Sequence, residues 1–141
     1  LTLLKNKLKD RITVHKDFGE IPPVECFPGK LNQVFMNILN NAIQSIQGKG
    51  DIFIKTRLAD RNEKNEPAFI TVSIKDTGIG MQEEIKKRIF EPFFTTKDVG
   101  GGTGLGLSIS YGIIESHNGK ITVETEPGKG SEFIIHLPIK Q

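Results

Sequence analysis

The chain has 141 residues, of which 36% are hydrophobic and 26% charged, so it fits one globular domain rather than a disordered or membrane protein. Its formal net charge of +2 is too small to indicate a nucleic-acid partner. The single cysteine, Cys26, excludes an internal disulfide. The chain starts at Leu1 with neither an initiator Met nor a signal-peptide pattern, so we expect it to be part of a longer protein.

The first third of the chain predicts a strand, a loop and a long helix. Residues 1–10 carry leucines at helical spacing and are expected to end an upstream helix or linker. Residues 12–16 alternate as a short strand, and the prolines and glycine of residues 22–29 predict a loop. Residues 31–46 repeat apolar side chains at i, i+3, i+4 and i+7, which predicts an amphipathic helix ended by the glycines of residues 48–50.

The middle of the chain predicts two strands and a short helix. Residues 51–58 and 69–75 have strand patterns, and the charged residues 60–67 between them are expected to form an exposed hairpin connection. Residues 76–80 interrupt this pattern with an aspartate and two glycines. Residues 81–89 predict a short helix.

The last third predicts an irregular segment, a helix and a closing hairpin. Residues 90–104 are aromatic and then glycine-rich, residues 105–116 predict a helix, and residues 117–119 predict a left-handed cap. Two strands, residues 121–125 and 133–137, follow around a Pro-Gly turn. The order of elements predicts a two-layer α/β sandwich: a mixed, mainly antiparallel sheet with about three helices on one face.

The long predicted helix carries four asparagines, although this residue is a poor helix former. Asn37, Asn41 and Gln44 are spaced i, i+4 and i+7 and therefore follow one flank of the apolar stripe. Amide oxygens can ligate Mg²⁺, which also prefers substrate phosphates. A solvated polar face that happens to use asparagine explains these residues equally well.

Asp76 follows an apolar strand and is flanked by Gly78 and Gly80. A carboxylate at this position can accept a hydrogen bond from the exocyclic amine of adenine, whereas it would repel the carbonyl of guanine. Taken alone, an ordinary Asp-Gly turn is the better interpretation.

Five glycines within residues 100–106 lead directly into an apolar helix. Glycines allow close approach to a ligand, and a helix N-terminus favours phosphate, so we favour phosphate binding over a flexible linker. Neither the P-loop pattern nor the dinucleotide pattern is present. The preceding residues 89–97, with three phenylalanines and Lys97, predict a mobile lid whose lysine reaches the terminal phosphate.

The three histidines have ordinary structural interpretations. His15 and His136 lie in predicted strands, and His117 lies at a helix end, where its partial charge suits the helix dipole. No group of Cys and His has zinc spacing.

Four segments, in this order, resemble the sequence boxes of the ATP-binding catalytic domain of bacterial sensor histidine kinases, in the ATPase group of gyrase B, Hsp90 and MutL. Residues 33–42 resemble the N box, residues 76–80 the G1 box, residues 89–97 the F box and residues 102–107 the G2 box. The resemblance implies the Bergerat ATP-binding fold over residues 11–141.

The resemblance also implies roles for single residues. Asn41 would hold Mg²⁺, with Asn37 and Lys97 as further catalytic residues. Many family members have a charged residue where this chain has Gln44, so its phosphate contact would fall to Lys97 or Lys120. The implied nucleotide-binding residues are Asp76, Gly78, Ile79, Gly80, Phe93, Gly102, Thr103, Gly104, Leu105, Gly106 and Leu107.

The implied activity is binding of Mg-ATP and transfer of its γ-phosphate to a histidine in a two-component phosphorelay. None of the three histidines precedes an acidic residue on a helix, so we expect the acceptor on a separate upstream dimerisation domain. A response regulator would be an indirect partner. We expect a cytoplasmic, monomeric domain within a homodimeric protein, which is either free or membrane-anchored, and no nucleic-acid partner.

Two alternatives remain. An ATPase or ATP-driven dimerisation switch of the gyrase B or MutL type would need a carboxylate early in the long helix, where only Glu25 lies nearby, just before it. An interaction module without kinase activity would not need the glycines and Asn41.

Overall fold

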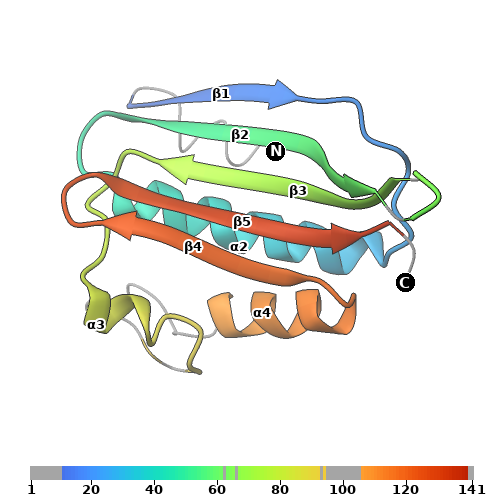
Figure 1. The fold of residues 1–141 in the computed structure, drawn as a ribbon. Helices are drawn as coiled ribbons and strands as arrows, with labels where there is room; N and C mark the ends of the chain where they lie inside the picture. Colours follow the sequence, from blue (N-terminus) through green and yellow to red (C-terminus); the bar gives the residue numbers. More distant parts are fainter. Residues whose placement is uncertain (1–10, 62, 66, 93, 95–105, 140–141) are drawn as a thin grey trace.

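The strands form a single mixed sheet. The computed structural model describes residues 11–61, 63–65, 67–92, 94 and 106–139. Its strand order is β1-β2-β3-β5-β4, in which β1 runs parallel to β2 and all other neighbours are antiparallel (Figure 1). The strands are β1 (Ile12–Phe18), β2 (Gly50–Arg61), β3 (Pro67–Asp76), β4 (Lys120–Glu126) and β5 (Gly130–Pro138). The predicted mixed, mainly antiparallel sheet is confirmed.

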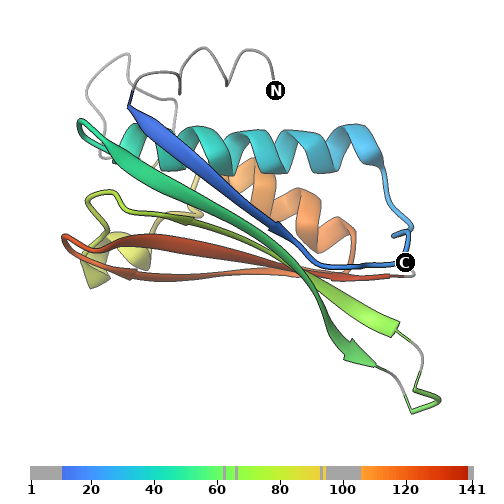
Figure 2. The ribbon, with the colours of Figure 1, turned by 90° about the horizontal axis from the view of Figure 1, so that it is seen from above.

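Helices α2 (Pro28–Ser45) and α4 (Gly106–Ser116) form the second layer and lie on the same face of the sheet (Figure 2). The short helix α3 (Glu83–Lys86) follows β3. The described residues thus contain three helices, which confirms the predicted α/β sandwich. No described helix has the length and apolar character that a membrane span requires.

The core lies between the helices and the sheet. Val34 and Ile38 of α2 and Ile114 of α4 have no exposed surface. In β5, Phe133, Ile135 and Leu137 point into this core, while the residues between them are only half-buried and face the other side of the sheet. The buried face of α2 therefore follows the helical spacing of apolar residues in the sequence, and the buried residues of β5 follow the alternate spacing of a strand. The core also contains three buried isoleucines of β2 and β3: Ile52, Ile70 and Ile74.

Two local boundaries differ from or refine the prediction. The loop expected over residues 22–29 ends earlier, because α2 already begins at Pro28. Proline is well tolerated there, since its missing N–H would have no partner in the first helical turn. At the end of α4, Asn118 has a φ of 59°, which confirms the predicted left-handed cap. The helix expected over residues 1–10 lies outside the described residues.

His117 is buried at the end of α4, where its ring bonds to two backbone groups. Its Nε2 accepts a hydrogen bond from the backbone N–H of Phe27 at 3.1 Å, so that nitrogen carries no proton. Its Nδ1 therefore donates to the carbonyl oxygen of Ile113 at 2.8 Å. The side chain joins the end of α4 to the start of α2.

Candidate functional site

The turn that follows β3 is held between the end of α2 and the β4–β5 turn. The backbone N–H of Ile79 donates to the carbonyl oxygen of Ser45 at 3.0 Å, and the carbonyl oxygen of Ile79 accepts from Gly128 at 2.7 Å. The N–H of Met81 donates to Oγ1 of Thr125 at 2.9 Å. Residues 76–81 are thus fixed from two sides by segments that are distant in sequence.

The glycines of this turn are required by close backbone contacts. A Cβ on Gly78 would lie 2.3 Å from Oγ of Ser45. A Cβ on Gly80, whose φ is +68°, would lie 1.9 Å from the carbonyl oxygen of Glu126. Since real side chains do not approach this closely, only glycine fits either position. The glycines therefore let the turn lie against both neighbouring segments, while the Ile79 side chain between them is 51% exposed.

Asp76 is a buried carboxyl with one oxygen left unpaired. The residue is 1% exposed. Its Oδ1 accepts hydrogen bonds from the backbone N–H of Gly78 at 2.8 Å and from the hydroxyl of Ser45 at 3.0 Å. Its Oδ2 has no partner of good geometry among the described residues. An unpaired buried acceptor is costly, so this oxygen is suited to a ligand that brings its own hydrogen-bond donor.

Burial raises the pKa of the Asp76 carboxyl above its usual value of 3.8. The hydrogen bonds from the backbone of Gly78 and the hydroxyl of Ser45 oppose this effect but do not reverse it. The carboxylate is therefore destabilised until a further donor reaches it. Raised carboxyl pKa values of this kind are typical of functional sites, although structural sites also show them.

Asn37 joins α2 to the start of α4. Its Nδ2 donates to the carbonyl oxygen of Gly106 at 3.1 Å and to Oγ of Ser110 at 3.2 Å. Gly106 is the first residue of α4 and the first described residue after the glycine-rich segment. The sequence predicted Asn37 beside the phosphates, and the structure places it against this helix start.

Asn41 lies one turn further along α2, between two hydrogen-bonded residues of the same helix face, Asn37 and Ser45. Asn37, Asn41 and Ser45 are spaced i, i+4 and i+8, so they follow one side of the helix over about 12 Å. The first contacts α4 and the last contacts Asp76. Asn41 is half-buried and has no hydrogen bond to another described residue. No described residue therefore blocks a ligand from meeting this amide between the two ends.

The described part of the predicted lid packs onto α4. Ile89 is buried, and the Phe90 ring lies 5.2 Å from the ring of Tyr111 between centroids. Arg88 lies over the ring of Phe94 at 4.5 Å. These aromatic side chains therefore serve packing. The remaining predicted lid and phosphate residues lie outside the described residues: Phe93, Lys97, Gly102, Thr103, Gly104 and Leu105. Leu107, the last predicted residue of this group, is half-buried in the first turn of α4.

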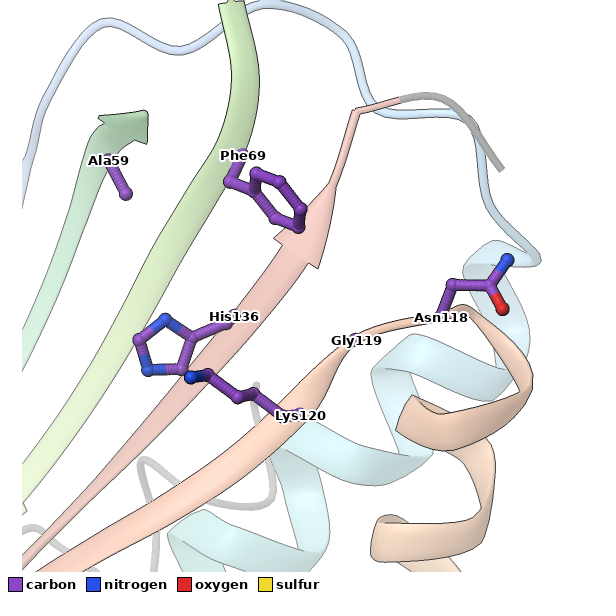
Figure 3. Close-up of a pocket in the computed structure, with 6 residues that line it drawn as sticks. All are labelled: Ala59, Phe69, Asn118, Gly119, Lys120 and His136. Carbon is purple, nitrogen blue, oxygen red and sulfur yellow. The ribbon is translucent and has the colours of Figure 1, made fainter. Parts of the chain in front are cut away.

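Lys120 lies far along the sheet from Asp76, and its compensating contact with phosphate stays a prediction. Lys120 pairs with His136 in the sheet, whereas Asp76 pairs with Ser131. Five residues along β5 correspond to about 17 Å. Lys120 instead lines a separate open cavity of about 500 Å³ with Phe69 and His136 (Figure 3). Gln44, whose phosphate contact Lys120 was expected to supply, is exposed.

Three hydroxyl residues at the site were missed by the sequence analysis: Ser45, Ser110 and Thr125. Ser45 and Ser110 are each bonded to a predicted site residue, Asp76 and Asn37. Thr125 holds the Met81 backbone. A serine at the end of the asparagine-bearing helix, eight residues after Asn37, was the available signal for Ser45.

The residues present fit a magnesium nucleotide. Asp76 offers an unpaired acceptor at one end of the helix face, and Asn41 offers an amide oxygen in the middle. The described residues contain no group of three His, Cys, Asp or Glu side chains arranged around a common metal position. An ion held by an amide oxygen would take further oxygens from phosphates and water, which is the usual behaviour of Mg²⁺.

Comparison with known proteins identifies an ATPase family. Residues 28–141 match the model of the histidine kinase-, DNA gyrase B- and HSP90-like ATPase family. The chain is 49% identical to sporulation kinase E of Bacillus subtilis over 122 residues, which are 86% of the chain and 15% of that protein. It is 41% identical to sensor kinase CckA of Brucella abortus over 145 residues, covering 96% of the chain and 15% of that protein.

Solved structures agree. The catalytic domain of histidine kinase ThkA superposes with a TM-score of 0.82 at 33% identity, covering 99% of this chain and 89% of that one. Full-length ShkA in complex with AMPPNP gives a TM-score of 0.82 at 26% identity, covering 97% of this chain and 28% of that one.

The chain belongs to the histidine kinase-, DNA gyrase B- and HSP90-like ATPase family. Within it, the chain is a catalytic ATP-binding domain of the sensor histidine kinase type. It spans about 15% of the length of the two curated relatives described above.

Proposed function

We propose that residues 11–141 bind Mg-ATP along the face of α2 and donate its γ-phosphate to a histidine on a separate dimerisation domain of the same protein. The observation that carries this proposal is the row of Asn37, Asn41 and Ser45. Its ends contact the α4 start and Asp76, and the middle residue has no described partner. One molecule lying along this row would reach all three regions.

Each part of the row has a distinct task. Oδ2 of Asp76 accepts the adenine amine, while Gly78 and Gly80 keep the base-binding turn against its neighbours. Asn41 holds Mg²⁺, which when bound neutralises charge on the phosphates. Gly106 and Leu107 bring the start of α4, the positive end of its helix dipole, towards the triphosphate.

The residues outside the described part complete this proposal. Phe93 and Lys97 belong to the proposed lid, and the segment from Gly102 to Leu105 binds phosphate. Ile79, which is exposed beside the two glycines, contacts the nucleotide. Catalysis on this chain consists of placing the γ-phosphate and neutralising its charge, so the isolated domain should bind ATP and transfer phosphate very slowly.

The hydrolase alternative lacks a suitably placed acid among the described residues. Helix α2 contains no Asp or Glu. Glu25 precedes the start of α2, sixteen residues before Asn41, and its backbone bonds to Ile139 at the other end of the sheet. The helix alone spans about 20 Å from Pro28 to Asn41. The geometry therefore favours transfer to a group on another domain over activation of water by this chain.

The wider assignment follows from the same proposal. The acceptor histidine lies in a dimerisation domain, a response regulator receives the phosphate later, and the full-length protein is a homodimer. The fragment is a monomer, and it works in the cytoplasm without a nucleic-acid partner.

Titration calorimetry with ATP and with GTP, each with Mg²⁺, tests the nucleotide assignment. We expect binding of ATP to be at least tenfold tighter, because one hydrogen bond to a buried carboxylate is made with adenine only. Equal affinities would remove the adenine role of Asp76.

A phosphotransfer assay with the acceptor domain supplied separately tests the metal role of Asn41. Asn41→Ala and Asn41→Asp are expected to lose transfer, whereas Asn32→Ala, an exposed asparagine of the same helix, retains it. Undiminished transfer by Asn41→Ala would clear Asn41 of this role.

A further inference from the structure

The first turn of α4 is attached to α2 through one carbonyl oxygen. Gly106 O accepts a hydrogen bond from Nδ2 of Asn37 at 3.1 Å and another from the hydroxyl of Ser110 at 2.8 Å. Ser110 lies one turn along α4 and has no exposed surface. The contact between Asn37 and Gly106 joins residues that are 69 positions apart in the chain.

The chemistry of the carbonyl group fixes the orientation of the Asn37 amide. A carbonyl oxygen only accepts hydrogen bonds, so the Asn37 atom that faces it must be the NH₂ group. The same NH₂ group also donates to Oγ of Ser110 at 3.2 Å, because the single proton of that hydroxyl is already given to Gly106. Asn37, Ser110 and Gly106 therefore form a closed group in which every donor has an acceptor.

This orientation leaves the amide oxygen of Asn37 pointing away from α4 and available to a ligand. Removal of the Ser110 hydroxyl would leave the NH₂ group with one acceptor fewer and Gly106 O with one donor fewer. The α4 start and the amide of Asn37 would then be held less firmly relative to Asn41. Both features face the proposed phosphate end of the site rather than the adenine end.

We propose that Ser110 is a positioning residue for triphosphate recognition: its buried hydroxyl orients the Asn37 amide and fixes the first turn of α4. The inference rests on the proposed function, because it assigns this task to the nucleotide site described above. Ser110 does not touch the nucleotide, and it acts through Asn37 and Gly106.

The test compares two ligands that share the base but not the phosphates. The ¹⁵N-labelled wild-type chain and Ser110→Ala are titrated with Mg-ATP and, separately, with adenosine. Ser110→Ala should bind Mg-ATP roughly tenfold more weakly, the effect of about one lost hydrogen bond, and adenosine within about twofold of wild type. Ser110→Thr, which keeps the hydroxyl, should restore most of the Mg-ATP affinity.

A matched control lies on the same helix. Ser116 also donates its hydroxyl to a backbone carbonyl of α4, that of Ile113, but at the exposed end far from Asn37. Ser116→Ala should therefore bind both ligands like wild type. Ser110→Cys keeps the side-chain volume with a weaker hydrogen bond and serves if Ser110→Ala fails to fold; it should show the same selective loss in smaller degree.

Three outcomes would contradict the inference, and they differ in meaning. Unchanged Mg-ATP affinity of Ser110→Ala or Ser110→Cys would exclude the positioning role alone. An equal loss for Mg-ATP and adenosine would show a general structural role for Ser110. Absence of Mg-ATP binding by the wild-type chain would overturn the proposed function together with this inference.

Discussion

Asn37 and Ser45 lie two turns apart on one face of α2, and each contacts a different end of the candidate site. Asn37 bonds to the start of α4, and Ser45 bonds to the carboxyl of Asp76. Helix α2 is therefore the element that relates the phosphate end to the adenine end. Changes at either end should have separable effects, which the following predictions use.

Asp76→Asn should remove adenine recognition. The variant replaces one carboxylate oxygen by an NH₂ group. The remaining oxygen stays on the Gly78 N–H and the Ser45 hydroxyl, so the new NH₂ group takes the place of Oδ2. This NH₂ group and the adenine amine are both donors and would face each other without an acceptor. Sites built around a buried hydrogen bond reject mismatched ligands strongly, so we expect ATP affinity to fall by about 100-fold or more in calorimetry. Asp51→Asn, an exposed carboxylate of β2, is the control. Retained ATP affinity of Asp76→Asn would be incompatible with this role.

ATP affinity should depend on pH through Asp76. Burial raises the pKa of this carboxyl above 3.8, and the ionised form is the stronger acceptor for the adenine amine. Affinity should therefore fall as the pH is lowered through the raised pKa, and ATP binding should release a proton in that range. Calorimetry in buffers of different ionisation enthalpy measures this release. A pH-independent affinity in Asp76→Asn and a pH-dependent one in wild type are expected, and identical profiles would refute the link.

The same raised pKa sets the sign of a stability effect. A carboxyl that binds its proton more tightly when folded stabilises the fold at low pH, and this contribution is lost as the pH rises from 3.8 through the folded pKa. The free energy of unfolding of Asp76→Asn should therefore improve relative to wild type as the pH rises through this window. Urea denaturation at several pH values measures the difference. A difference that moves in the opposite direction would mean that the folded pKa is lowered.

Gly80→Ala should cost more stability than Gly128→Ala. Both glycines have positive φ, +68° and +78°, so each substitution carries the left-handed penalty of about 1–2 kcal/mol. Only Gly80 also has a backbone oxygen 1.9 Å from the position of the new Cβ, whereas Gly128 has no atom within 4 Å. Gly80→Ala should therefore lose further stability and ATP binding. Equal unfolding free energies of the two variants would show that the turn is not held as tightly as described.

The layer architecture could be predicted because hydrophobic period and turn residues agree along the chain. The apolar stripe of α2 and the alternation of β5 both point into the observed core. The start of α2 at Pro28 could not be predicted in the same way. Proline usually breaks a helix and is tolerated only in its first turn, so the assignment depends on knowing where the helix begins.

The site was only partly predictable from the sequence. Asn41 and Asp76 stood out because asparagine is unfavourable in helices and because aspartate followed a buried strand. Ser110 could not be found in this way, and Ser45 only from its place on the asparagine-bearing helix, since their importance depends on contacts with residues 73 and 31 positions away. The distance of Lys120 from Asp76 could not be predicted for the same reason, because it follows from the register of strand pairing.

A single titration tests the central claim, that one nucleotide lies along α2. The ¹⁵N-labelled chain is titrated with Mg-ATP, and the amide signals of Asn41, Gly78, Gly80 and Gly106 are followed together. The account predicts that all four shift with one dissociation constant, because one ligand reaches both ends of the row. Shifts confined to one end, or different dissociation constants at Gly78 and Gly106, would contradict it.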